Sequence, residues 1–325
     1  MRRYARGRIA LFSSLVTVAA IALCAPAASA YPYPGHVAGD TGIHDPSLLI
    51  RSGVPRYTVF GTHNQTRVST NRVDFLGSGP AIAVAPAWWR DYNPANNFWA
   101  PDVSFHNGKY WLYYAVSTFG SQRSAIGLAT SVTGDPGTYI DQGIVLTSQP
   151  GSRYNAIDPH LFVDSNGRWY LTFGSFWDGI FTIGVDPATG KPSGSTTPLT
   201  HLAKRTSGGI EAPVIFKRGG HYYLFVSFDT CCQGTSSTYN VRVGRSTTST
   251  GPYVDKVGTA MLSGGGSLVL SSHDWVRGPG GQSVVNDPAD HDLLVYHYYD
   301  ARRAGAPHLG INFLGWDGAG WPYVW

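Results

Sequence analysis

Four acidic residues recur along the chain, each beside or close to a proline and each at the start of a short apolar run. They are Asp45, Asp102, Asp158 and Glu211, and successive members lie 57, 56 and 53 residues apart. Cleavage of a glycosidic bond needs two carboxyl groups in different protonation states, one to protonate the leaving oxygen and one to activate water or attack carbon. A third acid nearby can raise the pKa of the proton donor by like-charge repulsion. Because a single Asp-Pro pair is a common turn, the regular spacing of the set, and no single member, points to this chemistry.

Glu211 has the most informative local sequence of the four. It lies within Gly208-Gly209-Ile210-Glu211-Ala212-Pro213, where its neighbours are small or apolar. Such surroundings predict a desolvated carboxyl with a raised pKa, which suits a general acid.

The acids belong to a longer repeat that indicates how they are positioned. After each acid comes an apolar run, then a turn such as Asn107-Gly108, Asn166-Gly167 or Gly219-Gly220, and then an aromatic strand. Asn-Gly favours a tight hairpin because a type I′ turn needs positive φ at both central residues. A fifth, looser copy begins at Pro279. Five units of this length have room for four strands each, so the sequence predicts an all-β, five-bladed β-propeller in which the acids meet at one mouth of the axis.

Composition supports a turn-rich globular domain over residues 31–325. The chain has 40 Gly, 21 Pro and 13% aromatic residues, and only 14% of its residues are charged. The formal charge of +4 comes from four arginines in residues 1–30, so the remainder is neutral. A neutral domain without a basic stripe does not indicate a nucleic-acid partner, and it suits an uncharged polymer.

Residues 1–30 resemble an export signal. They combine basic residues, an apolar run from Ile9 to Cys24 and the small residues Ala28-Ser29-Ala30. This pattern predicts a cleaved secretory signal peptide and a secreted, extracellular product without a membrane anchor. In the rest of the chain the cysteines are the neighbours Cys231 and Cys232, so the fold does not depend on disulfides between distant segments. Whether these two form a vicinal disulfide stays open at this point.

Four motifs together resemble glycoside hydrolase family 43, and most closely its endo-acting α-1,5-L-arabinanases. The resemblance extends over nearly all of residues 31–325. The motifs are Gly42-Ile43-His44-Asp45-Pro46, Asn97-Phe98-Trp99-Ala100-Pro101-Asp102-Val103, Tyr154-Asn155-Ala156-Ile157-Asp158-Pro159-His160 and Gly209-Ile210-Glu211-Ala212-Pro213.

The resemblance implies an inverting enzyme and a role for each of three acids. Asp45 would be the general base, Glu211 the general acid, and Asp158 the residue that orients Glu211 and raises its pKa. An inverting pair stands about 6.5–9.5 Å apart. Asp102 is expected to be either structural or on the substrate side. Candidate substrate-binding residues are Trp99, with core packing as the alternative, and Asn155 and Ser175, with turn capping as the alternative. Phe119 and Trp177, in Gly-flanked loops, are further candidates for the cleft wall.

The resemblance also implies a metal ion near His297. In similar arabinanases the matching histidine faces a central ion, usually calcium, although a lone histidine is a poor calcium site because calcium prefers oxygen ligands. The implied partners are arabinan and arabino-oligosaccharides, with no nucleic acid and no membrane, and we expect the protein to act as a monomer.

Three alternatives bear on the activity. An exo-acting arabinofuranosidase or β-xylosidase of the same family would have a pocket instead of an open groove. A non-catalytic propeller lectin would explain the aromatic residues but would not need the three acids. A fructan-cleaving propeller is disfavoured, because such enzymes carry cysteine after the acid where this chain has Glu211-Ala212.

Overall fold

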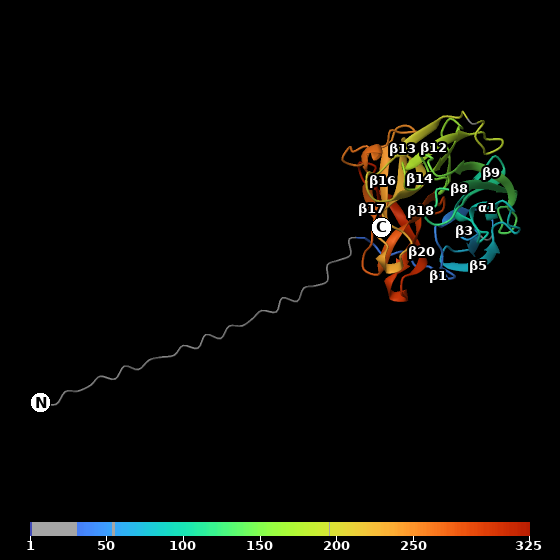
Figure 1. Ribbon diagram of the computed structural model, residues 1–325. Coiled ribbons are helices and arrows are strands. Elements are labelled where there is room, and N and C mark those ends of the chain that lie inside the picture. Colours follow the sequence, from blue (N-terminus) through green and yellow to red (C-terminus); the bar gives the residue numbers. More distant parts are fainter. Residues whose placement is uncertain (2–30, 54–55, 195) are drawn as a thin grey trace.

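The computed structural model describes residues 1, 31–53, 56–194 and 196–325. The proposed signal peptide therefore lies outside the described residues, apart from Met1. Five antiparallel sheets of consecutive strands follow one another around a ring, which confirms the five-bladed β-propeller (Figure 1). Within the described part of the chain, no helix has the length and apolar character needed to cross a bilayer.

Each blade contains four strands, with the first strand innermost. Blade 1 also carries a short strand, β1 (Ala38–Gly39), which pairs in parallel with its outermost strand β5. Blade 1 contains β2 (Ser47–Ile50), β3 (Tyr57–Gly61), β4 (Gln65–Ser69) and β5 (Asp74–Pro80), and blade 2 contains β6 (Trp99–His106), β7 (Lys109–Val116), β8 (Ser124–Ser131) and β9 (Ile140–Ser148). Blade 3 contains β10 (His160–Val163), β11 (Trp169–Phe173), β12 (Ile180–Val185) and β13 (Leu199–Ala203), and blade 4 contains β14 (Ile210–Arg218), β15 (His221–Phe228), β16 (Asn240–Ser246) and β17 (Ser267–Leu270). Blade 5 contains β18 (Val276–Asn286), β19 (Asp292–Asp300), β20 (Ala306–Trp316) and β21 (Pro322–Val324).

Helical segments are short. They are α1 (Trp89–Tyr92) and the 3₁₀ turns η1 (Gly234–Ser236), η2 (Met261–Ser263) and η3 (Ala301–Arg303).

The hydrophobic core is divided among the five contacts between neighbouring blades. Phe60 of blade 1 packs with Tyr114 of blade 2, and Phe225 of blade 4 packs with Tyr296 of blade 5, in separate buried clusters. Similar clusters join blades 2 and 3, blades 3 and 4, and blades 5 and 1. Most of the abundant aromatic rings therefore serve blade packing, which each sheet needs because it buries both faces.

The hairpin predictions are partly confirmed. Asn107 and Gly108 both have positive φ (50° and 73°) between the paired residues His106 and Lys109, as a type I′ turn requires. Gly219 and Gly220 likewise both have positive φ, between the paired residues Arg218 and His221. At Asn166-Gly167 the predicted hairpin is present, but its tight two-residue turn is not.

A five-residue loop connects β10 to β11 in place of that two-residue turn. Val163 pairs with Trp169, and the carboxylate of Asp164 accepts hydrogen bonds from the backbone N–H groups of Asn166 and Arg168. The side chain of Asp164 thus supplies the turn contacts that the backbone of a type I′ turn would supply.

One backbone feature repeats at the inner strand of every blade. Asp45, Ala100, Asp158 and Ala212 each have φ between 44° and 55° and each precede a proline, and Gly281 (φ 55°) takes the same place in blade 5. We call these five residues the axial positions. Proline has no N–H for the strand ladder, and the pairing of β6 and of β14 shifts register across its Ala-Pro step.

The axial positions refine the sequence interpretation of the four acids. Asp45 and Asp158 occupy axial positions, whereas Glu211 lies one residue before one and Asp102 lies two residues after one. The expectation that all four acids share one phase of the repeat is therefore wrong. Asp102 is the one acid that follows its axial position, which separates it from the other three.

The ring is closed by the segment 31–41. Ala38 and Asp40 donate backbone hydrogen bonds to Val73 and Phe75 on the blade 1 side, and Gly35 donates one to Ile311 of blade 5. Because the described blades share no strand, this segment and the packing between blades 5 and 1 provide the closure. In Figure 1, β1 and β20 lie on neighbouring parts of the ring.

Candidate active site

A cleft of about 720 Å³ opens at one end of the axis, and Asp45, Asp158 and Glu211 all line it. They come from blades 1, 3 and 4. Its wall also includes the residue just before the axial position in four blades, namely His44, Trp99, Ile157 and Glu211. The repeated bend at the blade starts thus aims several side chains at one space.

Asp45 is held from two sides. Its Oδ2 accepts a hydrogen bond from Thr62 Oγ1 at 2.6 Å, and Thr62 in turn accepts one from the backbone N–H of Ala100 at 2.9 Å. The backbone N–H of Asp45 donates to Nδ1 of His297 at 3.1 Å. This arrangement fixes the carboxylate, and its Oδ1, which lies 3.5 Å from Nδ1 of His297, has no hydroxyl donor among the described residues.

Glu211 carries two hydroxyl donors. Ser175 Oγ donates to Oε2 at 2.6 Å, and the phenol of Tyr239 donates to Oε1. Burial raises the pKa of Glu211, and these two hydrogen bonds oppose that shift. A carboxyl group with a raised pKa can still hold a proton near neutral pH and deliver it to a leaving group.

Asp158 lies beside Glu211 and shares its surroundings. Its Oδ2 accepts a hydrogen bond from the N–H of Ala212 at 2.9 Å, the residue that follows Glu211. Burial raises the pKa of Asp158 well above its usual range, and the nearby charges of Glu211 and Asp45 raise it further. The pair Asp158–Glu211 therefore favours one shared proton over two negative charges.

Asp102 does not line this cleft, and the structure assigns it a structural role. Its two oxygens contact His160 Nδ1 and the backbone N–H of Leu161, both at 2.9 Å, and His160 Nε2 reaches the carbonyl of Ile215 at 3.1 Å. These bonds join blades 2, 3 and 4 around a small axial cavity below the cleft. The choice left open between a structural and a substrate-side acid is thus decided by geometry.

The five predicted substrate-binding residues all lie on the cleft wall. The side chain of Phe119 is 83% exposed and that of Trp177 is 45% exposed, so both rings are available to a ligand, and Trp99 is half-buried. Asn155 is nearly fully buried, and its amide bonds Ser124, Ser148 and the carbonyl of Ser121. Those contacts favour the turn-holding role for Asn155, whereas Ser175 acts on Glu211.

Sequence reasoning missed Tyr239, Thr62, His44 and Phe176. His44 lies in the first acidic motif but was assigned no role, whereas the other three lie outside the motifs. Tyr239 reaches Glu211 from the end of the loop between β15 and β16. In the sequence, Phe176 is marked only by its position next to the predicted Trp177. In the structure both residues have positive φ, at 51° and 40°, which is rare for aromatic residues and marks a constrained turn.

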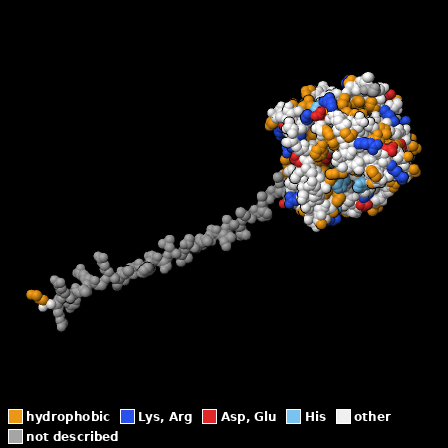
Figure 2. Space-filling view, viewed as in Figure 1, with side chains coloured by type: hydrophobic (Ala, Val, Ile, Leu, Met, Phe, Trp, Pro, Cys, Tyr) orange, Lys and Arg blue, Asp and Glu red, His pale blue; other side chains and the backbone are white. Residues whose placement is uncertain are grey.

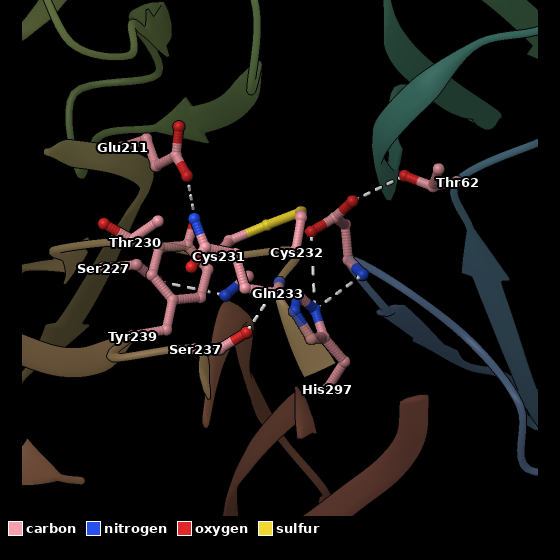
Figure 3. The surroundings of a disulfide bond; sticks show 12 residues. Thr62, Glu211, Ser227, Thr230, Cys231, Cys232, Gln233, Ser237, Tyr239 and His297 are labelled. Atoms are coloured by element: carbon pink, nitrogen blue, oxygen red, sulfur yellow. Dashed lines mark hydrogen bonds and ion pairs between the residues drawn. A yellow bond between two sulfur atoms is a disulfide. The ribbon is translucent and has the colours of Figure 1, made fainter. Parts of the chain in front are cut away.

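A disulfide joins Cys231 and Cys232 on the cleft wall. Figure 3 shows it between the side of the site that holds Glu211 and Tyr239 and the side that holds His297. The N–H of Cys232 donates to the hydroxyl of Tyr299 at 2.8 Å, which fastens this loop to blade 5. The pair therefore shapes the site locally and links no distant segments.

His297 is buried, and burial together with neighbouring His44 holds its pKa well below the usual range. Its Nε2 has no hydrogen-bond partner among the described residues. His44, Asp45 and His297 carry ligand atoms within 4.8 Å of one another. An unpartnered imidazole nitrogen beside one carboxylate fits a cation that keeps most of its shell as water, since calcium prefers oxygen ligands.

Comparisons with known proteins agree on the family. The family model for "Glycosyl hydrolases family 43" matches residues 39–322. Extracellular endo-alpha-(1->5)-L-arabinanase 1 of Bacillus subtilis is 44% identical over 289 residues, which is 86% of this chain and 87% of that protein.

Two solved structures agree with that match. The endo-arabinanase from Bacillus licheniformis superimposes with a TM-score of 0.82 at 44% identity, over 89% of this chain and 99% of the other. The alpha-L-arabinanase of Cellvibrio cellulosa, solved in complex with arabinohexaose, has a TM-score of 0.82 at 36% identity, over 87% of this chain and 95% of the other. With a propeller whose axial cleft gathers three carboxylic acids, and with this likeness along nearly its whole length, the chain belongs to family 43 of the glycosyl hydrolases.

Proposed function

We propose that this protein is a secreted, inverting hydrolase that cuts α-1,5-L-arabinofuranosidic linkages inside arabinan chains. The observation that carries the proposal is the gathering of Asp45, Asp158 and Glu211, from three different blades, on one cleft. The names of the relatives supply the linkage and the endo action.

The environments of the acids support distinct roles. Glu211, with its raised pKa, protonates the glycosidic oxygen. Asp45, oriented by Thr62, accepts a proton from the water that attacks the anomeric carbon on the opposite face of the sugar. Asp158 bonds the N–H of Ala212, and its charge helps to keep the proton on Glu211 until the leaving oxygen takes it.

An uncharged furanoside polymer suits the rest of the cleft. Its wall carries aromatic rings from Trp99, Phe119 and Trp177, and apolar ring faces pack against the C–H faces of sugars. Figure 2 shows that on one face of the molecule the acidic and basic side chains are scattered in small groups, without a broad basic patch. The Cellvibrio relative was solved with arabinohexaose, a six-unit ligand of this class.

The proposal includes a calcium ion held by His297 and water molecules. When bound, the ion would contribute positive potential near Asp45. In the arrangement described, Nδ1 of His297 accepts the Asp45 N–H, so the proton of the neutral ring is on Nε2. Binding of a cation at Nε2 requires the other tautomer, whose Nδ1–H faces Asp45 Oδ1 at 3.5 Å. Chelator treatment followed by metal analysis and calcium titration tests this part.

The decisive experiment is the product profile from linear α-1,5-arabinan over time. Endo action yields a ladder of oligosaccharides early, whereas exo action yields only short products of one size from the start. A lectin releases no reducing sugar at all. Proton NMR of the first product then shows whether the anomeric configuration is inverted, and a retained configuration would overturn the assigned roles. Size-exclusion chromatography tests the expected monomer.

A further inference from the structure

Tyr239 reaches the general acid from a part of the chain that carries none of the family-like acidic motifs. Its phenol donates to Oε1 of Glu211, while Ser175 Oγ donates to Oε2. The two oxygens of one carboxyl group therefore each have a hydroxyl donor, one from blade 3 and one from blade 4. The side chain of Tyr239 is 2% exposed, so this bond is shielded from bulk water.

The fold makes specific room for this ring. Tyr239 ends the loop between β15 and β16, where its N–H donates to the carbonyl of Thr230. A Cβ added at Gly280 in blade 5 would lie 2.2 Å from Cδ1 of the Tyr239 ring. Glycine at 280, just before the axial Gly281, thus leaves the space that the ring fills.

We infer that Tyr239 is a positioning residue for the general acid: it holds Glu211 in place and stabilises the negative charge left on it when the proton departs. This inference rests on the proposed role of Glu211. A hydrogen bond to a carboxylate is stronger than one to a neutral carboxyl, so the contact gains strength as the proton leaves. Groups that bind the developing charge more tightly than the ground state lower the barrier.

The same reasoning gives the direction in which loss of the Tyr239 hydroxyl shifts the pKa of Glu211. A donor to the carboxylate favours its charged form, so loss of the Tyr239 hydroxyl raises the pKa of Glu211. The titratable groups near the phenol are Glu211, Asp158 and Asp45. The ring centroid of His297 lies 6.0 Å from that of Tyr239. Burial and these negative charges keep the pKa of Tyr239 itself well above its usual range, so it remains a neutral donor.

The test compares Tyr239→Phe with Tyr253→Phe on arabinohexaose across a pH series. Tyr253 is also buried, and its hydroxyl donates to the carbonyl of Ser249, away from the cleft. We expect Tyr239→Phe to lower kcat by about 10²-fold, the smaller loss seen when one donor to a developing charge is removed. We expect KM to stay within a factor of about two and the alkaline limb of kcat to move to higher pH, because the acid keeps its proton longer. Tyr253→Phe should retain wild-type values.

A substrate with a good leaving group separates positioning of the acid from general damage. With the 4-nitrophenyl glycoside of an α-1,5-arabino-oligosaccharide the leaving oxygen needs little protonation, so Tyr239→Phe should approach the wild-type rate. Gly280→Ala provides a second route, because the added methyl displaces the intact ring from Glu211. It should reproduce both the fall in kcat and the alkaline shift, including if Tyr239→Phe fails to fold.

Two results would overturn the inference. One is a Tyr239→Phe enzyme, or a folded Gly280→Ala enzyme, whose pH profile and kcat match those of Tyr253→Phe. The other is an equal loss on the natural and the nitrophenyl substrates. If the wild-type protein does not cleave arabinohexaose at all, the proposed function fails instead, so the two failures are distinguishable.

Discussion

At the scale of single residues, the site depends on how each carboxyl is surrounded. Glu211 has two hydroxyl donors, Asp158 has one backbone N–H, and Asp45 has one hydroxyl. Burial raises the pKa of Glu211 and Asp158, which places the proton of the cleft on that pair. Asp45 stands across the axis in blade 1 and is left to act on water.

Removal of any of the three acids should abolish most turnover without unfolding the protein. General acid and base groups contribute about 10²–10⁴-fold each, so Asp45→Ala, Asp158→Ala and Glu211→Ala should lose rate on that scale. Initial rates on linear arabinan, with thermal melting curves as the folding check, measure this. Asp74→Ala is the control, because Asp74 is exposed on an outer strand. Wild-type turnover in Glu211→Ala would refute its role as the acid.

The buried acid pair should also cost stability in a pH-dependent way. The folded pKa of Asp158 is raised, so its stabilising contribution is complete below the unfolded pKa and is lost as pH rises through the folded pKa. Asparagine is neutral throughout and its carbonyl can still accept the Ala212 N–H. Asp158→Asn should therefore melt several degrees above the wild type at pH 8, while the two should nearly coincide at pH 4. A gap that widens on acidification would contradict this explanation.

At the scale of elements, the axial positions explain both what the sequence revealed and what it concealed. The Asp-Pro and Ala-Pro steps with their hairpins were enough to predict five blades and to nominate Asp45, Asp158 and Glu211. The role of Asp102 could not be predicted, because it depends on contacts with His160 and the backbone of Leu161 in the next blade. Tyr239 and Thr62 escaped notice because their contacts join segments 28 and 17 residues from the acids they hold, with no motif to mark them.

Gly281 is the axial position where no side chain can be added. Its φ is 55°, and a Cβ there would lie 2.4 Å from Oδ1 of Asp45 and 2.8 Å from Nδ1 of His297. Gly281→Ala should therefore displace the base, and a misplacement of about 1 Å can cost 10²-fold in rate. Steady-state kinetics measure the loss. Gly318→Ala, at a glycine with nothing within 4 Å of its added Cβ, should remain active. An active Gly281→Ala enzyme would show that the base tolerates displacement.

At the scale of the whole molecule, the ring depends on contacts and not on a shared strand. The segment 31–41 reaches both blade 1 and blade 5. Tyr33 contributes a hydroxyl bond to Asp274 at 2.8 Å and a stacked contact with Trp275, whose ring centroid lies 5.1 Å away. The packing between blades 5 and 1 is apolar and buried, like the packing at the other four contacts.

Loss of this closing segment should loosen the ring before it harms the chemistry. Tyr33→Ala should lower the melting temperature by a few degrees, and deletion of residues 31–40 should lower it further, while kcat at 25 °C changes little for Tyr33→Ala. Differential scanning calorimetry measures both. Tyr323→Ala is a matched control, since Tyr323 and Tyr33 are 48% and 49% exposed. If the two alanine variants melt together, the segment does not support closure.

The dispersal of the reacting groups over separate blades has a consequence for how activity arises during folding. Blade 1 supplies Asp45, blade 3 supplies Asp158 and Ser175, blade 4 supplies Glu211 and Tyr239, and blade 5 supplies His297. A nascent, clipped or half-refolded chain can therefore hold well-formed sheets and still be inert, because no single blade contains both the proton donor Glu211 and the water-activating Asp45. Recovery of hydrolysis after dilution from denaturant should consequently lag behind recovery of β-sheet circular dichroism, so that catalysis itself becomes a readout of the last step of assembly.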